Sequence, residues 1–198
     1  KLVWTQNETF EGDAQMANFL KEKLKGAVVE WKLEYLNGSV YKDGSFKLDI
    51  PNGGITDLGK ISIPLTGICQ AAKMVLKMEI RNTSFSNNWA IWVYPDKLPE
   101  ISEKKVMLTR EWNNRVKHYL QKGGTVLLLA DTAQVKSDVP PCFSSISWNA
   151  VWSGTPPNTL GILCNPKHAL FKHFPTEEHS NWQWFDLVRN SKPMLLDH

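Results

Sequence analysis

The spacing of hydrophobic residues changes near residue 95 of this 198-residue chain, and that change constrains the fold most. Before it, apolar and polar residues alternate through Val29-Glu30-Trp31-Lys32-Leu33, and such alternation is typical of half-buried strands. After it, Trp112, Val116 and Tyr119 recur at helical spacing. We therefore predict two domains, residues 1–95 and 96–198, with a joint near Pro95.

The first domain is predicted to be a β-sandwich of the immunoglobulin-like kind, with about seven strands. The pairs Asn37-Gly38 and Asp43-Gly44 and the triplet Asn52-Gly53-Gly54 are turn signals of the kind that close hairpins. We expect a strand rather than a helix over residues 9–19. The last strand, residues 89–94, has apolar residues on both faces and is predicted to be buried on both.

The second domain is predicted to be a small α/β, flavodoxin-like module. A helix should end at Gly123-Gly124, and the apolar run 125–130 should form a parallel strand covered on both faces. Further strands are expected at 160–164 and 193–196, with a helix between them near 167–172.

Composition excludes several classes of partner and cofactor. The 23 basic and 20 acidic residues are scattered and leave a net charge of only +3, so nucleic acid is not expected as a partner. No apolar run approaches the roughly 18 residues of a membrane span. The histidines lack metal-ligand spacing and no glycine-rich nucleotide motif is present, so no metal and no cofactor are expected. The chain starts without Met, and we expect a fragment of a longer protein.

The tract at residues 178–186 holds the densest group of candidate ligand-binding side chains, which are His179, Asn181, Trp182, Trp184 and Asp186. Indole rings can stack on a sugar face while the polar groups fix its hydroxyls, and Trp148 and Trp152 are further stacking candidates. The competing interpretation is a buried aromatic strand whose Asn181 and Asp186 satisfy backbone groups at its ends. Both interpretations stay open at this point.

Asp131 is a separate candidate, because it follows the predicted parallel strand 125–130, and open α/β sheets bind ligands at such strand ends. A loop hydrogen bond is the structural alternative for Asp131. Cys164, His179 and Asp186 could form a nucleophilic triad, although no glycine-rich turn surrounds Cys164. Glu177 and Glu178 are adjacent and should face opposite ways in a strand, which disfavours a glycosidase acid pair.

Several segments resemble the distal region of bacterial family 2 glycoside hydrolase-like proteins, of the β-galactosidase and sugar-binding-domain type. These segments are Pro175-Thr176-Glu177, His179-Ser180-Asn181-Trp182-Gln183-Trp184, Asp186-Leu187-Val188, Gly161-Ile162-Leu163-Cys164-Asn165-Pro166, Val28-Val29-Glu30-Trp31-Lys32-Leu33 and Trp92-Val93-Tyr94-Pro95. The resemblance implies an immunoglobulin-like sandwich that leads into a flavodoxin- or amidotransferase-like module.

The same resemblance implies that the chain itself has no catalytic residues. The catalytic glutamates of this family lie on a TIM barrel, which needs roughly 250 residues and cannot fit here. We expect a non-catalytic accessory fragment of an exported enzyme, periplasmic or extracellular, whose partner is the catalytic domain of the same polypeptide. The alternatives are a carbohydrate-binding module that stacks a glycan on exposed Trp, and a Cys-dependent hydrolase or amidotransferase.

Overall fold

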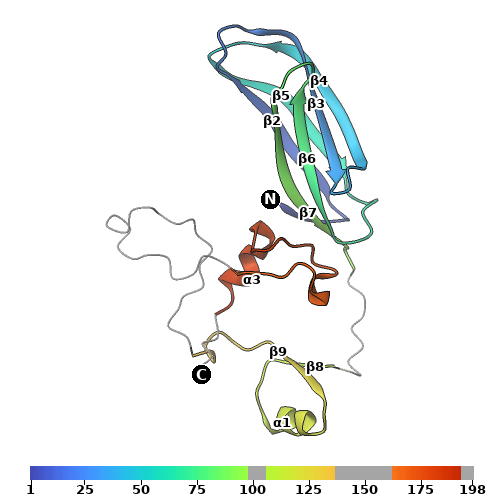
Figure 1. Cartoon of the computed structure of the whole chain (residues 1–198), viewed down its shortest axis with the longest axis vertical. Coiled ribbons are helices and arrows are strands. Elements are labelled where there is room, and N and C mark those ends of the chain that lie inside the picture. The colour runs from blue at the N-terminus through green and yellow to red at the C-terminus, as the bar shows by residue number, and fades with distance from the viewer. Residues whose placement is uncertain (98–105, 137–161, 193–198) are drawn as a thin grey trace, which may run out of the picture. The chain divides into compact units, whose positions relative to one another are not determined.

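The computed structural model describes residues 1–97, 106–136 and 162–192, and the fold is β-rich (Figure 1). The chain divides into two compact units. The first comprises Lys1–Lys97 together with Asn165–Glu178, and the second comprises the described residues among Leu98–Cys164 and His179–His198. A short segment from the second half of the sequence therefore belongs by its contacts to the N-terminal unit.

Seven strands build the first unit in two sheets. They are β1 (Val3–Thr5), β2 (Thr9–Asn18), β3 (Leu24–Tyr35), β4 (Val40–Ile50), β5 (Gly54–Pro64), β6 (Ala72–Ile80) and β7 (Ser86–Tyr94). One sheet has the order β1-β7-β6-β3-β4, and the other contains β2 and β5. The pair β1–β7 is parallel, and the other pairs in this unit are antiparallel.

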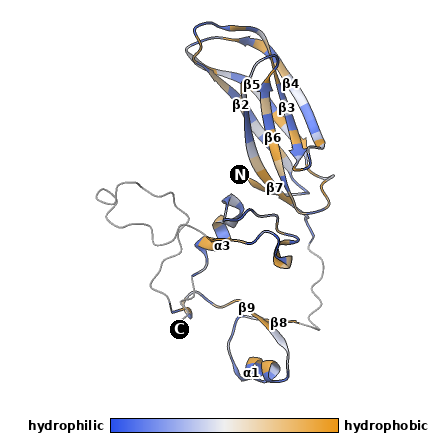
Figure 2. Cartoon of the chain, in the orientation of Figure 1, coloured by the Kyte–Doolittle hydropathy of each residue, from blue (hydrophilic) through white to orange (hydrophobic). Residues whose placement is uncertain are grey.

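Alternation along the sequence determines which face of each strand is buried, as the hydropathy colouring of Figure 2 illustrates. In β3, Val29, Trp31 and Leu33 are buried, and Trp31 and Leu33 lie opposite Met78 and Leu76 of β6. This confirms the half-buried strand that the alternation at residues 29–33 predicted. The preferred strand over 9–19 is also confirmed, since β2 covers Thr9–Asn18.

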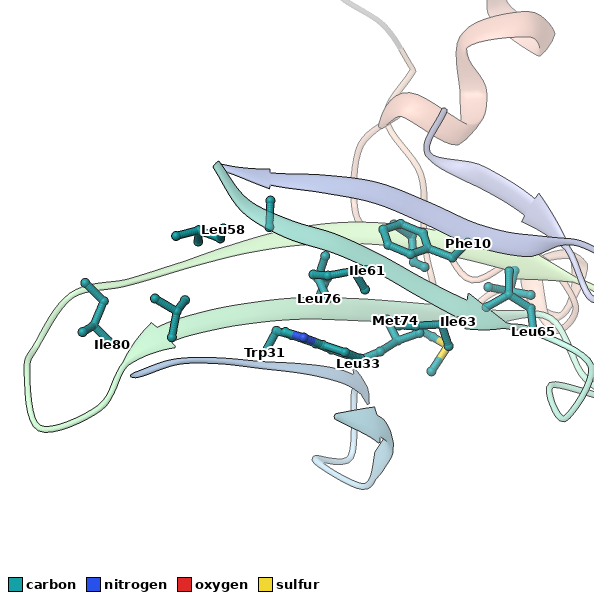
Figure 3. Packing of buried hydrophobic residues seen from close by; sticks show 14 of the residues in the cluster. Phe10, Trp31, Leu33, Leu58, Ile61, Ile63, Leu65, Met74, Leu76 and Ile80 are labelled. Carbon is teal, nitrogen blue, oxygen red and sulfur yellow. The ribbon is translucent and has the colours of Figure 1, made fainter. Parts of the chain in front are cut away.

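The hydrophobic core forms where the two sheets contribute side chains to one cluster (Figure 3). Phe10, Ile61 and Ile63 come from the two-stranded sheet, and Leu33 and Met74 come from the five-stranded sheet. Ile63, Leu33 and Met74 are fully excluded from solvent. Burial of this apolar surface, at about 25 cal/mol per Å², is the main force that holds the unit together.

One prediction for this unit is wrong, and another holds for only part of a strand. Asp43-Gly44 is not a turn but lies inside β4, where Gly44 pairs with Trp31 and its missing side chain leaves room for the indole ring. By contrast, Gly38 and Gly53 adopt the left-handed conformation, with φ of 84° and 79°, and do close turns. The strand at 89–94 is buried on both faces over residues 91–93, as predicted, but its first residue, Trp89, is 43% exposed.

The second unit contains a strand–helix–strand element made of β8 (Val106–Thr109), α1 (Asn114–Gln121) and β9 (Thr125–Leu128). The side chain of Asn113 accepts a hydrogen bond from Val116 N at 3.2 Å and caps α1, and Gly123 follows the helix with φ of 81°. β8 and β9 pair in parallel, which confirms the predicted helix and parallel strand. The predicted cover on both faces is wrong, since Leu127 is 53% exposed.

The remaining predicted elements are reduced or fall outside the described residues. Between 162 and 164 the chain makes an isolated antiparallel bridge, Leu163 with His179, in place of a strand. The helix expected near 167–172 is a short 3-10 helix, η1 (Ala169–Phe171). The strand expected at 193–196 lies outside the described residues, as do Trp148 and Trp152.

Candidate ligand-binding sites

A polar cavity of about 430 Å³ lies in the second unit at the ends of the two parallel strands. Arg110 and Glu111 follow β8, whereas Asp131, Thr132 and Gln134 follow β9. Leu129, Ala130 and Asn190 complete the lining. The carboxyl ends of parallel strands meet at one edge of a sheet, which is why side chains from both segments reach the same cavity.

Asp131 therefore lies where the sequence predicted a ligand, and it also has a structural role. Its Oδ1 accepts a hydrogen bond from Ala133 N at 2.9 Å, and its carbonyl accepts one from Gln134 N at 2.9 Å. These two bonds stabilise the turn that follows β9. Asp is common in such turns, because its side chain bonds the backbone N–H two residues further on. The side chain remains exposed in the cavity, so the turn and a ligand contact are compatible at this position.

The cavity offers one guanidinium, two carboxylates, two carboxamides and a hydroxyl, from Arg110, Glu111, Asp131, Gln134, Asn190 and Thr132. This is a set of donors and acceptors suited to a polyhydroxylated ligand, because sugar hydroxyls both donate and accept hydrogen bonds. Of these residues only Asp131 was a sequence candidate. The signal for Arg110 and Glu111 was available, since only Thr109 separates them from the apolar run Val106-Met107-Leu108. Asn190 had no local signal.

Residues 182–186 of the tract are helical, so the interpretation of the tract as an aromatic strand is wrong. Residues Trp182–Trp184 form the 3-10 helix η2, and Phe185–Arg189 form the helix α3. Asn181 starts the first turn, because its Oδ1 accepts a hydrogen bond from Gln183 N at 3.2 Å. In helical geometry Trp182 and Trp184 do not share a face as alternate residues of a strand do.

The exposure of the side chains in this tract differs from that expected of a buried aromatic strand. Gln183 is buried at 8% exposure, Trp182 is 59% exposed and Trp184 is half-buried. Trp182 lies 6.3 Å from Phe185, measured between ring centroids. Trp182 is therefore the more exposed of the two indoles considered for stacking, and Trp184 is less accessible.

The other polar residues of the tract take part in backbone structure. His179 bridges Leu163, and the Ser180 hydroxyl accepts a hydrogen bond from Ile162 N at 3.0 Å. The carbonyl of Asp186 accepts hydrogen bonds from the backbone N and the side-chain Nδ2 of Asn190, at 3.1 and 2.8 Å. These contacts hold the two ends of the tract in place.

The arrangement gives the triad of Cys164, His179 and Asp186 no support. The Cys164 thiol contacts the carbonyl of Ile162 at 3.7 Å. Leu163, and not Cys164, is the residue that pairs with His179 in the isolated bridge. Among the described residues, no group of three His, Cys, Asp or Glu side chains could hold a metal ion.

Upstream of the tract, Glu177 forms an ion pair with Lys73 of β6, within the first unit. In the same segment, the ring of Phe174 packs 6.0 Å from that of Tyr94 at the end of β7, and burial raises the pKa of Tyr94. Glu177 is therefore engaged with a lysine rather than paired with a second acid across a sugar site.

A second cavity, of about 530 Å³, is an apolar groove in the first unit between the end of β2 and the start of β7. Phe19 is 78% exposed, Phe85 46% and Trp89 43%, and all three line the groove. None of these aromatic residues was a sequence candidate. Phe19 follows the end of β2 and Phe85 precedes β7, whereas Trp89 lies inside β7, where the sequence predicted burial on both faces.

Comparison with known families assigns each half of the chain to a separate model. Residues 8–95 match the model described as Domain of unknown function (DUF8488), and residues 107–198 match Domain of unknown function (DUF8487). No curated protein matches the chain. In the described segments, no helix is long and apolar enough to cross a membrane.

Proposed function

We propose that this chain is a non-catalytic accessory region of a carbohydrate-degrading enzyme related to the family 2 glycoside hydrolases. One observation supports the proposal: several residues in the segments that resemble the family make contacts that stabilise the fold. Glu177 pairs with Lys73, Asn181 caps η2, and Trp92 is buried in β7. A catalytic region instead commits its characteristic polar residues to a shared reaction site.

The finer fold forms part of the same proposal. An immunoglobulin-like sandwich places its third, sixth and seventh strands in one sheet, and variants add a further strand beside the third. The order β7-β6-β3-β4 with β2 and β5 opposite agrees with that arrangement, and supports an immunoglobulin-like domain over residues 1–95. The β8–α1–β9 element supports a flavodoxin-like module within residues 96–198.

In this proposal the catalytic domain belongs to the same parent polypeptide, which acts in the periplasm or outside the cell. The chain then contributes stability or assembly rather than chemistry. The test compares the parent enzyme with a version that lacks residues 1–198, using aryl glycosides as substrates. We expect a lower melting temperature and a smaller folded fraction after deletion, with kcat per folded molecule changed less than about twofold.

Two outcomes would contradict the accessory role. One is hydrolysis of aryl glycosides by residues 1–198 alone at an enzymatic rate. The other is a large loss of kcat in the deleted enzyme while its melting temperature stays unchanged. An exposed-pair variant of the parent, Lys60→Met, controls for general effects of altering the sandwich, because Lys60 and its partner Glu11 are each 55% exposed.

The polar cavity favours a second candidate function, which is glycan binding by the chain itself. Asp131, Gln134 and Asn190 line it, and Trp182, which is 59% exposed, lies in the same unit. Calorimetry against a panel of oligosaccharides tests this function with wild type and Gln134→Ala. Binding that the substitution weakens supports it, whereas no heat from any sugar at millimolar concentration contradicts it.

A further inference from the structure

Three strand connections lie together at one end of the first unit. The end of β2 pairs with the start of β5, and the start of β3 pairs with the end of β4. β6 runs antiparallel to β3 and therefore ends on the same side. The connections 19–23, 51–53 and 81–85 consequently meet at this end, which is the upper end of the sandwich in Figure 1.

Large apolar side chains are exposed at this end. Phe19 is 78% exposed, and Ile55, the second residue of β5, is 71% exposed. Leu20 and Phe85 are also exposed, and both line the apolar groove together with Phe19. We refer to Phe19, Leu20, Ile55 and Phe85 as the apolar tip. Exposed apolar side chains gathered in one place are typical of docking surfaces.

A buried side chain holds the backbone that presents Phe19. Asn18 is 1% exposed, and its Nδ2 donates a hydrogen bond to Ile50 O at 3.2 Å. Its Oδ1 accepts one from Leu20 N at 3.0 Å, and its carbonyl accepts one from Gly53 N at 2.7 Å. Asn18 therefore joins two of the connections, so the exposure of Phe19 follows from the fold rather than from an unconstrained loop.

Basic residues lie in the same connections as the apolar tip. Lys21 and Lys23 lie between β2 and β3, and Arg81 lies between β6 and β7, where it forms an ion pair with Glu30. Both lysines are exposed, and neither forms an ion pair within the residues that the structure describes. The two ammonium groups are therefore available to external anions.

Acidic residues are scarcer at this end. Glu22 is the one acid in the three connections, so three basic residues and one acid leave them with a net charge of +2. Asp49 and Asp57 lie further back, within β4 and β5, where their carboxylates accept hydrogen bonds from amide groups at 2.6 and 2.7 Å. The end that carries the apolar tip therefore has an excess of positive charge, which complements an anionic surface.

The mixture of side chains favours a bilayer over a protein partner. Lysine is depleted in protein–protein interfaces. At a bilayer surface lysine is favourable, because its long stem lies along apolar surface while its ammonium reaches the lipid phosphates. Aromatic and aliphatic side chains meanwhile enter the boundary between the headgroups and the acyl chains.

We propose that the apolar tip docks on the surface of a bilayer that contains anionic phospholipid. Phe19, Leu20 and Ile55 enter the headgroup boundary, and Lys21 and Lys23 contact lipid phosphates. The chain then lies on the bilayer and does not span it. This inference goes beyond the accessory role proposed above and holds whatever the parent enzyme hydrolyses.

Sedimentation of the 198-residue chain with lipid vesicles tests this inference. We expect the chain to bind vesicles of equal parts phosphatidylglycerol and phosphatidylcholine at least about tenfold more tightly than vesicles of phosphatidylcholine alone. Added salt should reduce that preference, because it screens the lysines. No binding to either kind of vesicle, or equal binding to both, would overturn the inference.

A pair of apolar variants tests the contact of the tip with lipid. Phe19→Ser combined with Ile55→Thr should weaken binding at least about tenfold, because less apolar surface enters the headgroup boundary. Leu170→Ser is the matched control and should bind as wild type does, since Leu170 is 75% exposed but lies on η1. Wild-type affinity in the double variant would contradict the proposed contact.

A pair of charge variants tests the lysines in the same way. Lys21→Gln combined with Lys23→Gln should weaken binding by about fivefold for each lysine removed. Lys117→Gln combined with Lys122→Gln removes the same charge from the second unit and should change binding much less. Equal losses in the two double variants would show that net charge, and not the tip, attracts the chain, which also overturns the inference.

Hydrogen–deuterium exchange of the wild-type chain needs no variant. Anionic vesicles should slow exchange of the amides of residues 19–23 at least about threefold. The turn at Asn37-Gly38, at the other end of β3, should exchange equally with and without vesicles. A soluble protein or oligosaccharide that protects residues 19–23 when vesicles do not would identify a different occupant and refute the proposal. None of these readouts depends on hydrolysis, so this inference and the proposed function can fail separately.

Discussion

Lys73 and Glu177 form an ion pair although they are 104 residues apart in the sequence. The lysine belongs to β6, and the glutamate lies in the segment Asn165–Glu178, which joins the first unit. Their side chains are 22% and 29% exposed, and the Lys73 ammonium also lies 5.7 Å from the centroid of the Trp92 ring. The pair therefore fastens this segment to the sandwich.

The first prediction concerns the coupling of this pair. Lys73→Met, Glu177→Gln and the double variant form a double-mutant cycle, which we expect to give a coupling free energy of about 1 kcal/mol from chemical denaturation. A parallel cycle on the exposed pair Lys60 and Glu11, each 55% exposed, should give a smaller coupling free energy, because solvent screens exposed ion pairs. Equal coupling free energies in the two cycles would show that partial burial does not strengthen the ion pair between Lys73 and Glu177.

The second prediction concerns Gly44 and the indole of Trp31. A Cβ atom at Gly44 would lie 2.5 Å from Cζ2 of Trp31, whose side chain is buried at 9% exposure. Gly44→Ala should lower the free energy of unfolding by about 1–3 kcal/mol, because the ring must move within a packed core. Gly54→Ala is the control, since nothing lies within 4 Å of its added Cβ. Denaturation midpoints that shift equally in both variants would contradict this prediction.

Periodic segments could be predicted from the sequence because burial follows directly from their spacing. Trp31 and Leu33 in β3 and Val116 in α1 each lie on the face that the pattern indicated. Asp131 could be placed at a strand end for the same reason. Asn190, in contrast, reaches the same cavity from a distant segment, and no local pattern specifies such a contact.

The failures in prediction have identifiable physical causes. Gly44 resembles a turn residue, but its lack of a side chain is used to accommodate Trp31. The tract 178–186 resembles a strand because it is aromatic, whereas the capping side chain of Asn181 starts a helical turn. The exposure of Trp89 depends on how many strands the opposite sheet contains. The sequence of β7 alone does not specify that number.

The third prediction tests the cap at Asn181. Asn181→Ala removes the acceptor for Gln183 N, and we expect a loss of about 1 kcal/mol in the free energy of unfolding. Asn181→Asp should retain most of the stability, because aspartate accepts the same bond and favours a helix N-terminus. Thermal unfolding monitored by circular dichroism distinguishes the two. A variant pair with identical melting temperatures would argue against a capping role.

The fourth prediction concerns the pH dependence that Glu8 contributes. A hydrogen bond from Lys1, and another from Thr5 N to Oε2 at 2.7 Å, lower the pKa of Glu8 from 4.5 to about 2. Because the folded-state pKa is depressed, the stabilisation is fully present above about pH 4.5 and is lost as the pH falls toward 2. The difference in melting temperature between wild type and Glu8→Gln should therefore be largest near neutral pH and shrink steadily below about pH 4.5, disappearing only below about pH 2.

Lys1→Met provides the matched control for this prediction, because it removes the largest cause of the low pKa while Glu8 keeps its bond to Thr5 N. In that variant the pKa of Glu8 should rise, so the acid loss of stability should begin at higher pH than in wild type. Carboxyl titration by nuclear magnetic resonance measures the pKa directly. A Glu8 that titrates at the same pH with and without the lysine would show that Thr5, at the turn between β1 and β2, determines its charge instead.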